Sequence, residues 1–277
     1  MILGIDAGNK RTKVVTAKGA FAFESSIGEY RERKLVQRFG DDDMIFEYQG
    51  KRWFAGTLAQ YESEFGGSRK GDTKAHEEAK YRILLAIHRY SNEIVNDIVV
   101  GQPISRHTDD EKQKIFEMLR GEHIVSVDYG DGMVEKRIII RHVLVAAEGS
   151  AAILSQPQNG LIRIIDIGSG TINFGSVSDM RFIDRDSFTE RFGLETSKTK
   201  DMSVIARKIA NVALEKWDEN DHVRLAGGGA IPLRKLLKTY FSNCEILKPV
   251  HNNQELPPAF ANAVAFYKIG AMLYEGY

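Results

Sequence analysis

The chain is poor in cysteine and has no long hydrophobic run. Cys244 is the only cysteine among 277 residues, which excludes an intrachain disulfide and is typical of a reducing compartment. No apolar stretch approaches the roughly 20 residues that cross a membrane. The sequence enters a predicted strand at its first residues, without the pattern of a secretory signal. We therefore expect a cytoplasmic protein without membrane segments.

The sequence also lacks an excess of charge of either sign. Lysine and arginine together number 38, and so do aspartate and glutamate, so the formal net charge is zero. A balanced chain is unsuited to extended non-specific binding of DNA or anionic membranes, and zero net charge removes a barrier to self-association. The seven histidines show no metal-binding spacing. The length and composition are those of a globular protein with one large or two ordinary domains.

Two short glycine turns, half a chain apart, are the most informative feature that is present. Residues 2–9 and 164–171 each contain an apolar run, then an aspartate (Asp6 or Asp166) and a glycine two positions later, and each leads into a second predicted strand. Glycine lets backbone N–H groups approach a phosphate oxygen, and an aspartate can hold a divalent cation or orient a water. One such turn is most often an ordinary strand connection. The matching pair predicts two β-hairpins facing each other across a cleft.

Three further segments favour a nucleotide site. Residues 225–230 predict a strand end, a triple-glycine turn and a helix start, which together admit a flat or charged ligand. Residues 145–152 predict a helix of small side chains that carries Glu148, and residues 259–266 predict a second helix of this kind. Small side chains would let two helices cross closely, as a hinge between lobes needs. Either helix alone would be an ordinary packed core helix.

The stretch 156–160 contains proline, asparagine and glycine and is the best predicted boundary between two lobes. We expect a first lobe of residues 1–156, with a small subdomain inserted at about 28–71, and a second lobe of residues 157–257. The C-terminal helix within residues 258–277 is assigned to the first lobe. Further helices are predicted at about 72–90, 109–119, 201–217 and 230–240.

The order of two phosphate turns, two connecting helices and a glycine-rich adenosine turn resembles the actin, Hsp70 and sugar kinase superfamily. Residues 166–171 and 101–105, together with the short length, are most similar to bacterial plasmid-segregation actins of the ParM/StbA type. Typical members carry an extra subdomain between the second phosphate turn and the adenosine turn. The short interval from Asn173 to Val223 leaves no room for it, which resembles the short AlfA form.

This resemblance implies an α/β actin-like ATPase fold, with two ribonuclease-H-like lobes around a nucleotide cleft and a second lobe without its usual extra subdomain. It implies an ATP hydrolase that uses ATP and Mg²⁺, with GTP left open, and that polymerises into filaments to segregate plasmid DNA. A DNA-binding adaptor on the plasmid centromere is the implied partner, with no direct DNA binding by this chain. A small-molecule kinase of the same superfamily and a non-hydrolysing scaffold are the alternatives.

The resemblance also implies roles for individual residues. Asp6 and Asp166 would flank the metal and the terminal phosphate, and Glu148 would act with Asp166 in catalysis by positioning or deprotonating the attacking water. Lys13 could instead be an exposed strand lysine, and Glu148 a solvent-facing glutamate. The implied nucleotide contacts are Asp6, Gly8, Asn9, Lys10, Thr12 and Lys13 in the first turn, Gly168, Ser169, Gly170 and Thr171 in the second, and Gly227, Gly228 and Gly229 around the adenine and ribose.

Overall fold

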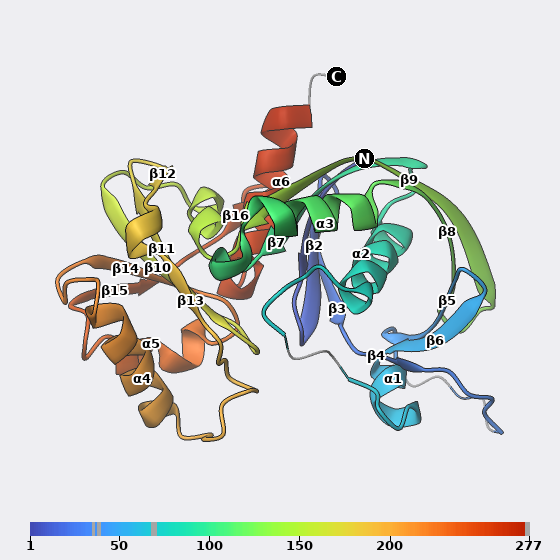
Figure 1. The fold of residues 1–277 in the computed structure, drawn as a ribbon, viewed down its shortest axis with the longest axis horizontal. Helices are drawn as coiled ribbons and strands as arrows, with labels where there is room; N and C mark the ends of the chain where they lie inside the picture. The colour runs from blue at the N-terminus through green and yellow to red at the C-terminus, as the bar shows by residue number, and fades with distance from the viewer. Residues whose placement is uncertain (35–36, 38–39, 68–70, 275–277) are drawn as a thin grey trace.

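The computed structural model describes residues 1–34, 37, 40–67 and 71–274, and they form two large β-sheets (Figure 1). Part of the expected inserted subdomain, including residues 68–70, and residues 275–277 of the expected C-terminal unit lie outside the described residues. The first sheet comes from the N-terminal half of the chain, and the second comes from residues 161–246.

The first sheet has nine strands, in the order β3-β2-β1-β7-β9-β8-β5-β6-β4. Their bounds are β1 (Ile2–Ala7), β2 (Arg11–Thr16), β3 (Gly19–Glu24), β4 (Ile27–Glu29), β5 (Asp43–Tyr48), β6 (Lys51–Gly56), β7 (Val95–Gln102), β8 (Gly121–Asp128) and β9 (Met133–Ala147). Strands β4 to β6, from the segment predicted as an insertion, continue the sheet through antiparallel pairing of β5 with β8. The sheet curves around helix α2 (Glu77–Tyr90) (Figure 1). Helix α1 (Thr57–Glu62) packs at the end of the sheet formed by β4, β5 and β6, whereas α3 (Asp109–Leu119) packs on β9, in the middle of the strand order.

The second sheet has six strands and repeats the start of the first. Its strands are β10 (Leu161–Ile167), β11 (Ile172–Ser178), β12 (Arg181–Phe182), β13 (Phe188–Glu190), β14 (His222–Ala226) and β15 (Asn243–Ile246). As β1 pairs antiparallel with β2 and parallel with β7, so β10 pairs antiparallel with β11 and parallel with β14. Helices α4 (Met202–Leu214) and α5 (Ala230–Leu237) supply apolar faces to the core of this half.

The segment between β11 and β14, which the resemblance predicts to be short, contains few helices and strands. Between β11 and β14, residues 179–221 form only β12, the 3₁₀ turn η3 (Asp184–Asp186), β13 and α4. All of these residues are described, and they contain no second α/β unit. The prediction of a reduced second lobe is therefore confirmed at the level of the fold.

The C-terminal helix α6 (Ala261–Tyr274) follows the 3₁₀ turn η4 (Pro258–Phe260) and packs directly on the first sheet. A Cβ added at Gly4 of β1 would lie 2.2 Å from the backbone nitrogen of Tyr267. Only a residue without a side chain allows this approach. A small antiparallel pair, β16 (Val250–His251) and β17 (Gln254–Glu255), precedes the helix.

Two predictions about secondary structure are wrong. Residues 145–152 do not form one helix, because β9 continues to Ala147 in parallel pairing with β7, and only the 3₁₀ segment η2 (Ser150–Ser155) follows. The helix predicted from about residue 72 begins at Glu77, where the side chain of His76 accepts a hydrogen bond from the N–H of Ala79. None of the described helices is long and apolar enough to span a bilayer.

Candidate functional site

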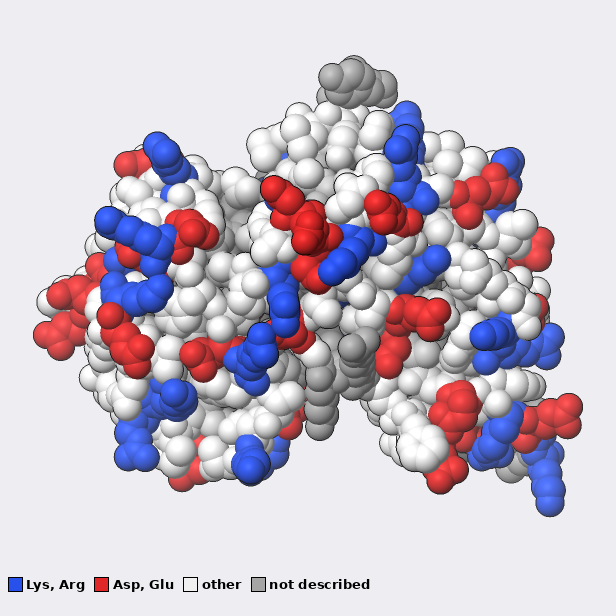
Figure 2. Space-filling view, in the orientation of Figure 1, with Lys and Arg blue, Asp and Glu red and all other residues white. Residues whose placement is uncertain are grey.

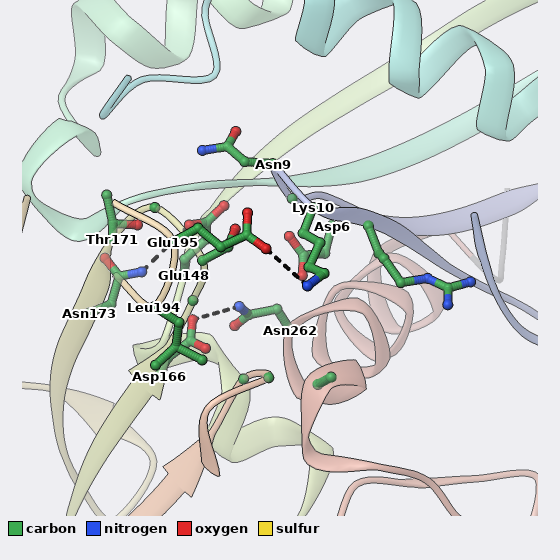
Figure 3. Close-up of a pocket in the computed structure, with 18 of the residues that line it drawn as sticks. Asp6, Asn9, Lys10, Glu148, Asp166, Thr171, Asn173, Leu194, Glu195 and Asn262 are labelled. Atoms are coloured by element: carbon green, nitrogen blue, oxygen red, sulfur yellow. Dashed lines mark hydrogen bonds and ion pairs between the residues drawn. The ribbon is translucent and has the colours of Figure 1, made fainter. Parts of the chain in front are cut away.

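A cavity of about 530 Å³ lies between the two hairpin turns (Figure 3). The turn after β9, the glycine-rich turn after β14 and the start of α6 also contribute to its wall. Segments far apart in the sequence therefore meet at one place. The predicted site residues that line it are Asp6, Gly8, Asn9, Lys10, Lys13, Glu148, Asp166, Gly168, Ser169, Gly170, Thr171, Gly227 and Gly228.

Two predicted residues, Thr12 and Gly229, are not part of this lining. Thr12 is fully buried on the other side of β2, where its hydroxyl is 2.9 Å from that of Ser25. Side chains alternate along a strand, so Lys13 and Thr12 cannot both face the cavity. A Cβ added at Gly229 would lie 2.3 Å from Cγ2 of Ile167, so this glycine serves the packing of α5 against β10.

In each of the two hairpin turns, a glycine packs against the backbone carbonyl oxygen three residues later. A Cβ added at Gly8 would lie 2.8 Å from the carbonyl oxygen of Arg11, and one at Gly168 would lie 2.8 Å from that of Thr171. Both turns therefore need glycine, and they leave bare backbone beside the cavity. The turns also approach each other, because a Cβ at Gly170 would lie 2.7 Å from Nδ2 of Asn9.

Each hairpin places one aspartate opposite a polar partner. Asp6 pairs in register with Lys13, whose Nζ lies 3.1 Å from Oδ2 of the aspartate. Asp166 occupies the same position in the second hairpin and pairs in register with Asn173. Burial raises the pKa of Asp166, and the negative charge of Asp6 acts in the same direction, while a hydrogen bond from Asn262 opposes it.

Glu148 lies in the turn after β9 and is 6% exposed, so the alternative of a solvent-facing glutamate is wrong. The amide of Asn173 donates to its Oε2 over 3.5 Å, and Oε1 is buried without a hydrogen-bond partner among the described residues. Burial raises the pKa of Glu148 to about 7, and the charge of Lys74 is the main opposing effect. A carboxyl group that titrates near neutral pH can take up or release a proton during a reaction.

Several cavity residues were not predicted from the sequence. The Nζ atom of Lys74 donates to the carbonyl oxygen of Ala7 at 2.9 Å, and the side chain of Gln102 accepts from the backbone N–H of the same lysine at 2.7 Å. Glu195 pairs with Lys10 at 2.9 Å across the mouth of the cavity. These contacts join distant parts of the chain, and no local motif marks them. The other unpredicted lining residues are Arg11, Asn173, Leu194, Met202, Ala259 and Asn262.

The carboxylates of Asp6 and Asp166 are suited to a magnesium ion that also binds a phosphate ligand. Asp6 and Asp166 face one cavity from opposite sides. Across the described ranges, no group of three His, Cys, Asp or Glu side chains could hold a metal ion. Mg²⁺ is commonly bound by one or two carboxylates, with waters and substrate phosphates completing its shell. Two carboxylates beside two phosphate-type turns match that mode.

Comparison with known proteins identifies a family and a fold. Residues 4–150 match the family model described as the N-terminal domain of actin-like proteins. No curated protein sequence matches the chain. An AlfA filament bound to AMPPNP superimposes with a TM-score of 0.76 at 19% identity, covering 100% of this chain and 96% of that chain.

Two further solved structures give the same result. A 15-stranded ParM filament from Clostridium botulinum has a TM-score of 0.78 at 20% identity, covering 98% of this chain and 99% of that chain. The archaeal actin homolog Ta0583 in complex with ADP has a TM-score of 0.76 at 17% identity, covering 99% of each chain. At these identities the likeness shows the fold, which is actin-like.

Proposed function

The chain belongs to the actin-like protein family, and we propose that it is an ATPase that forms nucleotide-dependent filaments and segregates plasmid DNA. The observation that carries the proposal is the cavity that brings Asp6, Glu148 and Asp166 together with both glycine turns. The similar structures with bound AMPPNP and ADP support a nucleotide as the ligand. We further propose that residues 1–156, together with the C-terminal helix, form the first lobe and that residues 157–257 form the second.

The phosphates would lie between the two hairpin turns. Backbone N–H groups of residues 168–170 and of the first turn would donate to phosphate oxygens, and Lys13 would add a positive charge. The Gly227–Gly228 peptide, with Leu194, Met202 and Ala259, lines the rest of the cavity and would border the base and ribose. These contacts do not distinguish adenine from guanine, so ATP is proposed from the resemblance.

In hydrolysis, Glu148 would accept the proton of the attacking water or orient that water, because its carboxyl group has an oxygen without a hydrogen-bond partner among the described residues. Asp166 would hold the water or the metal shell from the opposite hairpin. Mg²⁺ bound by Asp6 and Asp166 would neutralise charge on the phosphates. Lys13 and Lys74 would stabilise charge that develops on the terminal phosphate.

Filament formation is supported by the assemblies named for two similar structures, an AlfA filament and a ParM filament. A head-to-tail contact that does not close generates an open filament. Figure 2 shows acidic and basic side chains interspersed on the face it draws, without one large basic region among the described residues. This distribution suits an indirect attachment to DNA through an adaptor protein on the plasmid centromere.

Sedimentation and electron microscopy with ATP and Mg²⁺ test the proposal. We expect pelletable filaments with ATP or AMPPNP and a monomer without nucleotide. Glu148→Ala and Asp166→Ala should bind nucleotide but release phosphate on the order of 10²-fold more slowly. A protein that stays monomeric at tens of micromolar under varied salt, yet phosphorylates a small molecule, would instead be a kinase of the same superfamily.

A further inference from the structure

Asn262, in the first turn of α6, joins the two elements that carry the candidate catalytic carboxylates. Its Nδ2 donates to Oδ2 of Asp166 at 2.9 Å, and its Oδ1 accepts from the backbone N–H of Gly149 at 3.0 Å. The side chain is 6% exposed and lines the cavity. Figure 3 shows it reaching from α6 toward Asp166. One amide therefore links the end of β10 to the turn that presents Glu148.

The position of Glu148 depends strongly on the backbone of that turn. Its carboxyl group is held by one long hydrogen bond of 3.5 Å from Asn173, and Lys74 lies 3.7 Å away. The turn itself is tight, because Gly149 has a φ of 75° and an added Cβ would lie 2.9 Å from Cβ of Asn173. The bond from Gly149 to Asn262 therefore fixes a turn whose carboxylate has few contacts of its own.

Making both bonds at once requires an amide. Asparagine offers a donor and an acceptor on one short side chain. Aspartate at position 262 could still accept from Gly149, but it would place a second carboxylate against Asp166. Leucine has a similar shape and could make neither bond.

We propose that Asn262 is a positioning residue that holds the carboxyl groups of Glu148 and Asp166 in the relative positions that hydrolysis requires. This inference rests on the proposed ATPase function. Since Asn262 acts through the two carboxylates, its loss should lower the rate of the chemical step and leave nucleotide affinity nearly unchanged.

The experiment compares Asn262→Leu and Asn262→Asp with the same two substitutions at Asn92, an exposed asparagine in the loop after α2. We expect kcat for phosphate release to fall by roughly 30-fold or more in both Asn262 variants. The dissociation constant of AMPPNP should stay within about threefold of wild type. The Asn92 variants should match wild type in both quantities.

Amide hydrogen exchange provides a readout that does not need turnover. A peptide that contains Gly149 should exchange faster in Asn262→Leu than in wild type, whereas Asn262→Asp should keep most of the protection because its acceptor remains. If Asn262→Leu fails to fold, Asn262→Asp still decides the kinetic test. A fall in its kcat for phosphate release, with an unchanged dissociation constant of AMPPNP, would support the proposal.

The outcomes separate the two proposals. If the wild-type protein releases no phosphate with any nucleotide, both the proposed ATPase function and this inference are overturned. An active wild type with equally active, folded Asn262 variants would overturn only the positioning role. An equal loss of kcat and nucleotide affinity would show that Asn262 supports the pocket as a whole and would also overturn it.

Discussion

The Nζ atom of Lys74 lies 3.7 Å from Oε1 of Glu148, and it also donates a 2.9 Å hydrogen bond to the carbonyl oxygen of Ala7. The ammonium group of Lys74 thus connects the first hairpin turn to Glu148, the candidate general base. Its side chain is 12% exposed, so solvent screens this charge only weakly. Lys74 comes from the loop before α2, which places part of the site on the segment that follows the first-lobe insertion.

We predict that Lys74→Met slows phosphate release on the order of 10²-fold, because a positive charge beside the reacting phosphate and Glu148 is lost. Lys74→Arg should recover part of the rate, since it keeps the charge with a different geometry. Lys114, which is exposed on α3, is a matched control whose replacement by Met should have no effect. Full activity in Lys74→Met would show that this lysine is only structural.

The stability of the protein without nucleotide should depend on pH through Glu148. Its pKa is about 7 when folded and 4.5 as an ordinary carboxyl group. The folded state therefore binds the proton more tightly than the unfolded chain. The contribution of Glu148 is most favourable below pH 4.5 and declines as pH rises toward 7.

Glu148→Gln keeps a neutral side chain at every pH. We predict that it raises the melting temperature relative to wild type by a few degrees at about pH 8, with little difference at about pH 5. Differential scanning calorimetry at both pH values measures this. Glu122→Gln, at an exposed position on β8, is the control. A melting difference that is the same at both pH values would contradict the raised pKa.

The glycine-rich turn after β14 allows a test of where the nucleotide base binds, with little effect on folding. A Cβ added at Gly228 meets no atom within 4 Å, whereas one at Gly229 would collide with Ile167. Gly228→Val should therefore fold normally but lower nucleotide affinity at least about tenfold, because its side chain occupies space beside the ligand. Calorimetric titration measures the affinity. Unchanged binding would mean that the turn only starts α5.

The ion pair between Lys10 and Glu195 crosses the mouth of the cavity, and both side chains are about half exposed or more, at 64% and 47%. Exposed pairs contribute little to stability. We predict that Glu195→Ala leaves the melting temperature unchanged but speeds nucleotide release by up to about fivefold at low salt. The difference should vanish in about 1 M salt because the pair is then screened. Stopped-flow displacement of a fluorescent nucleotide would measure the release rate, and equal rates at low salt would show that the ion pair does not slow nucleotide release.

Local patterns predicted the parts of the site that are local in the chain. The Asp-x-Gly turns, the flanking strands and the triple glycine are each contained within a short stretch of sequence, and the structure forms all three. The strand alternation that makes Lys13 face the cavity turns Thr12 away from it, and this alternation can be read from the sequence alone. Gly229 could not be separated from Gly228 in this way, because its contact with Ile167 is tertiary.

The remaining parts depend on contacts between distant segments. Residues 145–147 have small or apolar side chains that suit a helix or a strand, and parallel pairing with β7 decides for the strand. Lys74 and Asn262 reach the cavity from a loop and a helix that lie far apart in the sequence. Lys74 belongs to no recognisable motif. The small-residue pattern of 259–266 predicts a helix around Asn262 but not the contacts of its amide. A single sequence gives no signal that would bring these two side chains together.

Under the proposed function, nucleotide binding, assembly and hydrolysis belong to one cycle. Because the second lobe is reduced, we propose that each protomer helps to cover the cleft of its neighbour. The most direct test measures phosphate release and pelleted protein in the same samples over a range of protein concentration, with ATP and Mg²⁺. We expect both to rise together above one critical concentration, and bound nucleotide to be retained only in the pellet. Phosphate release that is proportional to protein concentration, with nothing in the pellet, would contradict the proposed cycle.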